Sequence, residues 1–437
     1  MRLYPSQPPI PLSGNLDATL FSSLPQKSIF LKSPRQVIGI FEVGSNNEPS
    51  FIMTKQIKVG VVGCGYWGPN LIRNFRSISE CELRMMCDLN QARLNHLNSL
   101  YPEVEAATDY KHMLNGCGLD AVVIATAVKT HFPMAKASLL AGKHTFIEKP
   151  MASSSEECEE LNEIARKKGL VLMAGHTFLY SPAVRKIKEI VDRGDIGEIR
   201  YICARRLNLG LYQKDINVAW DLAPHDISII QHIMGESPLT VNCQGSAHVT
   251  PGIEDVTTMC LGFSKQRTAI IHSSWLDPRK VREMTIVGSK RMIVYDDLSP
   301  LEKIKVFDAR VERPPHYDTF AEFHYAYHYG DVYIPYLKQE EPLKTECQHF
   351  LDCIRTGATP LTSGLQGLEM VRVLEASSAS LKRGGAPVEL STFKKDDAQP
   401  TRGLRDGLSA SQPKSRGKTD ARRSDKKLRI KINLNGQ

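Results

Sequence analysis

The sequence lacks both an apolar run long enough to cross a membrane and any cysteine pair with metal-ligand spacing. Its longest apolar stretch, Leu119 to Val128, is far shorter than the roughly 20 residues of a membrane helix. Met1 to Pro49 holds seven prolines and no continuous apolar run, so we expect neither a signal peptide nor an anchor. None of the ten cysteines belongs to a C-x-x-C motif. We therefore expect a cytoplasmic protein with reduced cysteines, no membrane association and no bound metal.

Most of the chain also lacks an excess of either charge. The formal net charge is +8, from 56 Lys and Arg against 48 Asp and Glu. The segment from Lys394 to the C-terminus has 13 basic and 5 acidic residues, which accounts for the whole excess. A charged tail of this kind is usually solvated and disordered, and only sometimes an arm that binds nucleic acid or a membrane. The body is neutral, so the composition gives no reason to expect a nucleic-acid partner.

The pattern of apolar residues divides the chain into four parts. A chain of 437 residues exceeds the usual size of one hydrophobic core. We expect an irregular leader over residues 1–54, a dinucleotide-binding domain over 55–175, a substrate and oligomerisation domain over 176–392, and a basic, disordered tail over 393–437. Met53 is an alternative start of the protein.

The first predicted domain alternates apolar strands with helices, which is typical of an α/β fold with a doubly wound parallel sheet. Its strands are predicted at Ile57–Val62, Leu83–Cys87, Ala121–Ala125, Thr145–Ile147 and Val171–Ala174, and its helices at Tyr66–Arg76, Gln91–Leu100, Phe132–Leu140 and Ser155–Lys167. The second domain has strand candidates in direct succession, which predicts an α+β domain with a largely antiparallel sheet. These strands are predicted at Ile199–Leu207, Thr240–Val249, Val256–Phe263, Thr268–Trp275, Met284–Val287 and Met292–Tyr295, and two helices at Glu346–Arg355 and Leu368–Leu381.

A glycine motif marks the predicted cofactor site. Gly63, Gly65 and Gly68 form G-x-G-x-x-G, with Tyr66 and Trp67 inside it, between the first predicted strand and the first helix. Such a turn lets the backbone approach a pyrophosphate, whose charge the helix N-terminus favours. A glycine turn without a ligand is the alternative.

Asp88 ends the second predicted strand. A carboxylate at this place accepts hydrogen bonds from the ribose hydroxyls and repels a 2′-phosphate, which favours NAD over NADP. An Asp at a strand end is also a common helix cap.

Two further segments hold candidate acid–base residues. Lys149 follows the predicted strand Thr145–Ile147 and can stabilise developing charge on a substrate oxygen. Asp221 and His225 are four residues apart, with Pro224 between them. A histidine that titrates near neutrality can take a hydroxyl proton, and a carboxylate can orient its ring. A capping Asp beside a structural His is an equally good interpretation of that spacing.

These motifs, in this order, resemble the glucose–fructose oxidoreductase, inositol dehydrogenase and rhizopine-catabolism (Gfo/Idh/MocA) family over about residues 55–390. The motifs that carry the resemblance are Val61 to Gly68, Ala125 to His131, Glu148-Lys149-Pro150 and Asp221 to His225. The resemblance implies that Lys149 and His225 are the catalytic pair, with Asp221 in support. It also places Thr126, His131 and Glu148 around the cofactor.

Within the family, the segments Gly175 to Pro182 and Arg205 to Gly210 resemble the branch that oxidises UDP-N-acetylglucosaminuronic acid at carbon 3. Guanidinium groups pair well with a diphosphate or a uronate. Because successive strand residues face opposite sides, at most one of Arg205 and Arg206 can contact substrate directly. The candidate substrate-binding residues are His176, Tyr180, Arg205, Arg206, Asn208 and Lys214.

The sequence thus predicts an NAD-dependent oxidoreductase that acts on a CH–OH group, with a UDP-N-acetylated uronic acid or related nucleotide sugar as substrate. A free sugar or inositol is the alternative substrate. A regulator of the same fold that senses the nucleotide without turnover is the alternative from another functional class. The resemblance implies a homodimer or homotetramer packed through the second domain's sheet.

Overall fold

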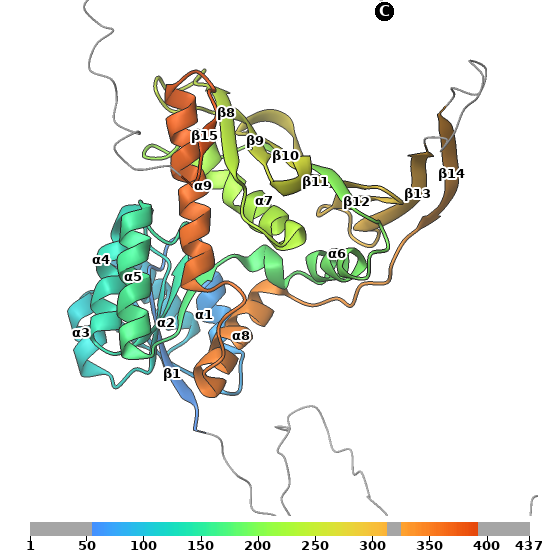
Figure 1. Cartoon of the computed structure of the whole chain (residues 1–437). Helices are drawn as coiled ribbons and strands as arrows, with labels where there is room; N and C mark the ends of the chain where they lie inside the picture. The colour runs from blue at the N-terminus through green and yellow to red at the C-terminus, as the bar shows by residue number, and fades with distance from the viewer. Residues whose placement is uncertain (1–54, 313–324, 392–437) are drawn as a thin grey trace, which may run out of the picture. The chain divides into compact units, whose positions relative to one another are not determined.

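The computed structural model describes residues 55–312 and 325–391. The predicted leader and basic tail lie outside these ranges. The described part contains a parallel and a mostly antiparallel sheet (Figure 1). No helix in it combines the length and apolar character that crossing a bilayer demands. All ten cysteines are free thiols, and eight of them are buried.

The first sheet has six strands in the order β3-β2-β1-β4-β5-β6, and every neighbouring pair is parallel. Its strands are β1 (Ile57–Val62), β2 (Cys81–Cys87), β3 (Glu105–Ala107), β4 (Ala121–Ile124), β5 (His144–Glu148) and β6 (Leu172–Gly175). The central strands β1 and β4 are buried at nearly every residue because helices cover both faces, which explains their continuous apolar runs. The prediction of a doubly wound parallel sheet is confirmed.

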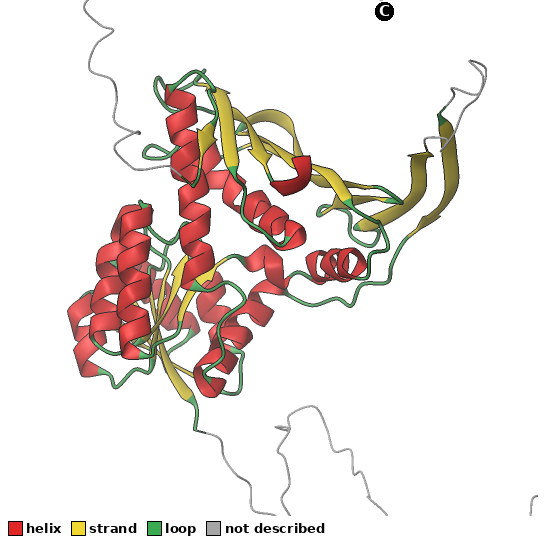
Figure 2. Ribbon diagram, in the orientation of Figure 1, coloured by secondary structure: helices red, strands yellow, loops and turns green. Residues whose placement is uncertain are grey.

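Helices pack on both sides of this sheet (Figure 2). They include α1 (Gly68–Arg76), α2 (Gln91–Leu100), α3 (Tyr110–Gly116), α4 (Val128–Leu140) and α5 (Ser155–Lys168). Asn90 and Ser154 cap α2 and α5 with their side chains. The short β3 and α3 were not predicted. Helix α4 begins four residues before its predicted start and contains Pro133.

The second sheet has nine strands in the order β14-β13-β12-β11-β7-β10-β9-β8-β15. They are β7 (Ile199–Leu209), β8 (Thr240–Ser246), β9 (Val256–Gly262), β10 (Thr268–Ser274), β11 (Leu276–Gly288), β12 (Met292–Asp296), β13 (Ile304–Glu312), β14 (Ala326–Tyr333) and β15 (Val388–Glu389). Among the described strands of this second sheet only β7 and β10 pair in parallel, so the prediction of a largely antiparallel sheet is confirmed. Strands β13 and β14 were not predicted.

The remaining described helices lie between β6 and β15 in the chain. They are the short η1 (Thr177–Tyr180), α6 (Pro182–Asp192), α7 (Val218–Met234), α8 (Pro342–Thr356) and α9 (Gly364–Lys382), and η2 (Ser264–Gln266) lies between β9 and β10. Although α8 and α9 lie between β14 and β15 of the second sheet in the chain, α8 packs on α1 and α9 packs on α5. The predicted domain boundary at residue 175 therefore separates α1 and α5 from the helices α8 and α9 that pack on them.

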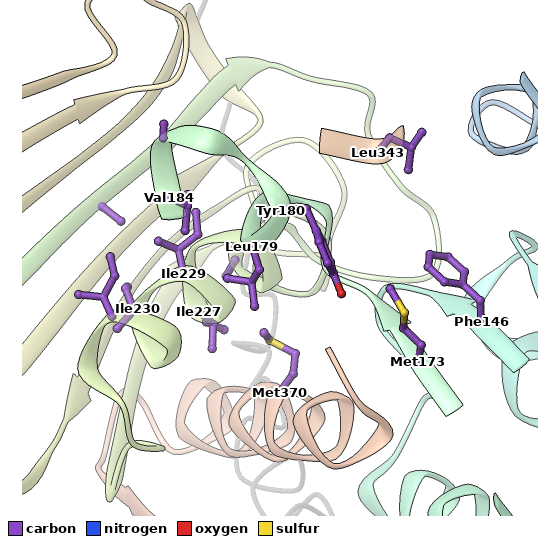
Figure 3. Packing of buried hydrophobic residues seen from close by; sticks show 14 of the residues in the cluster. Phe146, Met173, Leu179, Tyr180, Val184, Ile227, Ile229, Ile230, Leu343 and Met370 are labelled. Carbon is purple, nitrogen blue, oxygen red and sulfur yellow. The ribbon is translucent and has the colours of Figure 1, made fainter. Parts of the chain in front are cut away.

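One hydrophobic core runs between the sheets (Figure 3). Phe350 of α8 meets Phe75 of α1 and Phe146 of β5 in edge-to-face contacts. Leu179 and Met370 continue the same cluster toward the second sheet. These large side chains come from distant segments of the chain, and their burial in one cluster holds the two sheets together.

Candidate functional site

The glycine turn after β1 is a tight cradle. Gly63 has φ +95°, and a Cβ there would lie 2.4 Å from the Ala125 carbonyl oxygen of the turn after β4. A Cβ on Gly68 would lie 1.8 Å from the Gly63 carbonyl oxygen. Gly65 is less constrained, because its Cβ would come no nearer than 3.4 Å to the Arg93 guanidinium. This close approach of backbone at the start of α1 fits a dinucleotide pyrophosphate.

Asp88 lies beside that turn at the carboxyl end of β2. Its Oδ2 accepts a hydrogen bond from the Cys64 amide at 2.6 Å, and its Oδ1 accepts one from the Asn90 amide at 2.8 Å. The carboxylate thus joins the glycine turn to the start of α2. A half-exposed carboxylate in this place fits the ribose hydroxyls of NAD.

The two aromatic residues of the motif differ in their contacts. Tyr66 is 86% exposed, whereas the Trp67 indole N–H donates to Glu148 Oε1 at 2.6 Å. Glu148 ends β5 and is buried, with Gly175 of β6 packed against its carboxyl group. Burial raises the pKa of Glu148 to about 7, although the nearby Lys149 opposes this shift. The Trp67–Glu148 hydrogen bond therefore connects the glycine turn to the loop that follows β5.

His131 in α4 and Thr126 in the turn between β4 and α4 lie at the same edge of the sheet. The His131 ring is buried, with Nδ1 2.9 Å from the Pro150 carbonyl oxygen and Nε2 3.0 Å from the Thr126 carbonyl oxygen. Burial lowers the pKa of His131. Thr126 Oγ1 accepts a hydrogen bond from Thr130 Oγ1 at 2.7 Å. Both ring nitrogens of His131 face backbone, so this residue fixes the loops after β4 and β5.

Lys149 and Asp221 meet across the two halves of the protein. Lys149 Nζ donates to the Asp221 carbonyl oxygen at 2.8 Å and lies 3.4 Å from Asp221 Oδ1. The other carboxylate oxygen of Asp221 accepts from the Trp275 indole N–H at 3.0 Å. Trp275 is buried directly after β10. The sequence-based expectation was that Asp221 orients His225, but these carboxylate contacts orient the Lys149 ammonium.

His225 lies one helical turn after Asp221 in α7, and Phe178 packs against its ring at a centroid distance of 5.0 Å. Burial lowers the pKa of His225 well below its usual value, and the positive charges of Lys149 and Arg206 add to that effect. The ring is therefore neutral at neutral pH, not near its titration midpoint. The unprotonated imidazole can accept a proton, and its surroundings make it a weak base.

His176 is a buried neighbour of this pair. Neither of its ring nitrogens has a hydrogen-bond partner among the described residues. Burial lowers the pKa of His176 to about 4, and the charge of Lys149 contributes. Buried polar atoms are normally satisfied, so the free nitrogens of His176 favour a contact with a bound molecule.

Several residues predicted to bind substrate already have protein partners. Arg206 is buried and forms a bidentate pair with Asp226, at 2.8 and 2.9 Å, while its guanidinium lies 4.7 Å from the Phe178 ring centroid. Arg205 faces the other side of β7 and pairs with Glu283. The buried Tyr180 hydroxyl lies 3.0 Å from Thr362 Oγ1. Arg206 and Tyr180 are thus buried side chains with partners inside the protein.

The remaining two residues lie nearer to open space. Asn208 is half-buried beside Gly210, and Lys214 is exposed in the segment before α7. The next residues of that segment line a cavity of about 400 Å³. Its lining includes Lys129 and Ser153 from the first half, and Asp215, Asn217, Trp220 and Glu254 from the second. Lys149, Asp221 and His225 do not line this cavity, whose nearest link to them along the chain is Trp220, the residue before Asp221.

Comparison with known proteins identifies the family. Residues 57–176 match the model of an oxidoreductase family with an NAD-binding Rossmann fold, and residues 184–294 match the GFO/IDH/MocA C-terminal domain. The chain belongs to the Gfo/Idh/MocA family. It is therefore an NAD-binding oxidoreductase, which confirms the predicted enzyme class and cofactor.

Relatives within the Gfo/Idh/MocA family are distant. The uncharacterized oxidoreductase YrbE of Bacillus subtilis is 27% identical over 76% of this chain and 96% of its own. The myo-inositol 2-dehydrogenase of Thermotoga maritima is 24% identical over 75% of this chain and 96% of its own. The UDP-N-acetylglucosamine 3-dehydrogenase of Acidithiobacillus ferrooxidans is 28% identical over 56% of this chain and 75% of its own. Its solved structure superposes with a TM-score of 0.62 at 24% identity, covering 76% and 99% of the two chains, which shows a shared fold.

Sequence reasoning missed Trp275, Asp226 and Phe178 as parts of this Gfo/Idh/MocA site. Asp226 directly follows His225, but adjacency on a helix does not reveal that its partner is Arg206 on β7. Trp275 lies at the end of a predicted strand. The available signal was that a buried indole N–H usually has a hydrogen-bond acceptor. Its contact with Asp221 spans 54 residues and needs the tertiary fold.

Proposed function

We propose that this protein oxidises a ring hydroxyl of a sugar or cyclic polyol, with Lys149, Asp221 and His225 as the acting residues. The observation that carries the proposal is the Lys149 ammonium held on Asp221 beside a neutral His225, at the edge shared with the glycine turn. An ammonium group has three N–H donors. Two of them point to Asp221, so one remains for a substrate oxygen.

Lys149 would bind and polarise the reacting hydroxyl. As the carbon loses a hydride, negative charge grows on its oxygen, and an ammonium in a partly buried place stabilises that charge. Asp221 and the Trp275 indole fix the direction of the ammonium. Asp221 is thus a positioning residue for Lys149.

His225 would take the hydroxyl proton at one of its ring nitrogens. Its low pKa keeps the ring unprotonated over the physiological range, and Phe178 restricts the ring's rotation. The proton leaves the substrate oxygen as the carbonyl forms. NAD, when bound, supplies the acceptor for the hydride.

A UDP-N-acetylated sugar, including its uronic acid with oxidation at carbon 3, is the first substrate that we propose. The relative named UDP-N-acetylglucosamine 3-dehydrogenase supports it, as do the free nitrogens of His176. A neutral sugar or inositol is the second candidate. The nearby cavity is lined by two acidic residues, Asp215 and Glu254, against one basic residue, Lys129, and this acidic excess would repel a diphosphate. The relative named myo-inositol 2-dehydrogenase also favours this second candidate.

The test is NADH formation, followed by absorbance, with NAD and a panel of UDP-sugars, free sugars and inositols. Each substrate is run with and without 2-oxoglutarate as a second substrate that could reoxidise the cofactor. The variants are Lys149→Met and His225→Ala. His232→Ala, which changes a half-buried histidine near the other end of α7, is the matched control.

Reduction of NAD by a substrate of one class, lost in Lys149→Met and His225→Ala but kept in His232→Ala, supports the proposal and names the class. Equal turnover in all variants would refute the assigned roles. Tight NAD binding without turnover on any substrate would favour the nucleotide-sensing alternative.

A further inference from the structure

Three side chains of different chemistry converge at the outer edge of the first sheet, away from the glycine turn. Glu105 lies on the edge strand β3, His112 on α3, and Cys117 directly after α3. Their ligand atoms all lie within 4.8 Å of one another. The carboxylate and the imidazole are exposed, and the thiol is buried beneath them.

The distances suit a small tetrahedral metal ion. His112 Nε2 lies 3.3 Å from Glu105 Oε1, and Cys117 Sγ lies 3.8 Å from Glu105 Oε2. Zinc bonds of 2.0–2.3 Å place neighbouring ligand atoms roughly 3.3–3.6 Å apart in a tetrahedron. The three side chains therefore need only small rotations to share one ion.

The local fold brings these ligands together within a short segment. Asp109 caps α3 through the Lys111 amide and sets the start of the helix that carries His112. The His112 ring packs against Gly116, which precedes Cys117. Behind the thiol, the Met85 sulfur lies 3.7 Å from Cys117 Sγ, so the thiol can be reached from the side of Glu105 and His112.

We propose that Glu105, His112 and Cys117 form a site for one soft divalent ion, zinc by chemical class, with water as the fourth ligand. Thiolate with imidazole and carboxylate selects zinc over magnesium or calcium, which prefer all-oxygen ligands. The expectation of no metal rested on the lack of a C-x-x-C pair. That motif does not reveal a site made of one carboxylate, one imidazole and one thiol. Burial and the Glu105 charge raise the pKa of Cys117, so metal binding would release its proton.

The site would stabilise the edge of the cofactor domain. Strand β3 has three residues and pairs with β2 alone. The Asp88 amide donates to the Ala107 carbonyl oxygen at 3.2 Å, so β3 also supports the residue proposed to hold the ribose. A metal ion bound by Glu105 of β3 and His112 of α3 would hold the edge strand against the helix.

The experiment is a titration of the reduced, chelator-treated full chain with Co²⁺ and then Zn²⁺. Cobalt bound to a thiolate gives a sulfur-to-metal charge-transfer absorption band. The variants are Cys117→Ser, His112→Ala and Glu105→Gln, and the control is His96→Ala, another exposed histidine. Circular dichroism checks folding, and the two exposed substitutions keep the test valid if Cys117→Ser does not fold.

We expect one equivalent of Co²⁺ with the thiolate band, displaced by Zn²⁺, in the unchanged chain and in His96→Ala. Cys117→Ser should lose the band, and His112→Ala and Glu105→Gln should weaken binding at least tenfold. Absence of the band from the unchanged chain would overturn the proposal. Equal affinity in all variants would also overturn it.

Discussion

The proposed cofactor side, around the glycine turn, and the proposed substrate side, around Lys149, are held by different kinds of contact. On the cofactor side, backbone meets backbone, so that a Cβ on Gly68 would lie 1.8 Å from the Gly63 carbonyl oxygen. On the substrate side, charged side chains meet across elements, as in Lys149–Asp221 and the buried Arg206–Asp226 pair. The cofactor side should therefore respond to added volume, and the substrate side to removed charge.

The largest expected effect is that of Arg206→Met on stability. The substitution leaves the Asp226 carboxylate buried without its partner, which typically costs about 3–5 kcal/mol. Arg205→Met is the matched control on the same strand, because its pair with Glu283 is exposed and exposed pairs contribute about 0–1 kcal/mol. Urea denaturation measures both. Equal losses in the two variants would contradict the assigned difference in burial.

Lys149→Met should lower kcat by about 10²–10³, the usual loss when one donor to a developing oxyanion is removed. NAD affinity should change little, because the contacts of the ammonium are on the substrate side. Steady-state kinetics on the identified substrate and titration with NAD separate the two quantities. A variant with unchanged kcat would remove Lys149 from the chemistry.

Gly68→Ala should weaken NAD binding by about 10- to 100-fold, since forced displacement of packed atoms costs about 1–3 kcal/mol. Gly142→Ala is the control, because a Cβ on this glycine after α4 meets open space away from the turn. Calorimetric titration with NAD gives both affinities. If both variants bind equally, the close approach of Gly63 and Gly68 does not shape the cofactor site.

The smallest expected signal is a pH dependence at the junction of the two sides. The folded protein keeps a proton on Glu148 up to about pH 7, whereas the unfolded chain releases it near the ordinary pKa of 4.5. This group's contribution to stability should therefore fall as pH rises from about 4.5 to about 7, and then stay constant. Tryptophan fluorescence should titrate near pH 7 through Trp67, one of three tryptophans.

Glu148→Gln provides the control for that titration, because an amide oxygen still accepts from Trp67 but does not ionise. The midpoint near pH 7 should vanish in this variant and in Trp67→Phe. Persistence of the transition in Glu148→Gln would assign it to another group.

Local patterns were enough to predict the parallel sheet and its cofactor turn. Val59, Val61 and their neighbours form a run that only a doubly covered strand buries completely, and Gly63 to Gly68 lie between strand and helix as expected. Helix α7 was harder, because Pro224 lies inside it and removes one backbone donor. Strands β13 and β14 were missed because they carry few buried residues.

By itself, the sequence determined the fold class, the NAD turn and the identity of Lys149, Asp221 and His225 as candidates. Only the tertiary structure decided what these side chains contact: Asp221 contacts Lys149 and Trp275, and Arg206, a predicted substrate ligand, pairs with Asp226. The physical reason is range. Periodicity and turn chemistry act between residues close in the chain, whereas the partner of a charged side chain is set by the packing of elements tens of residues apart.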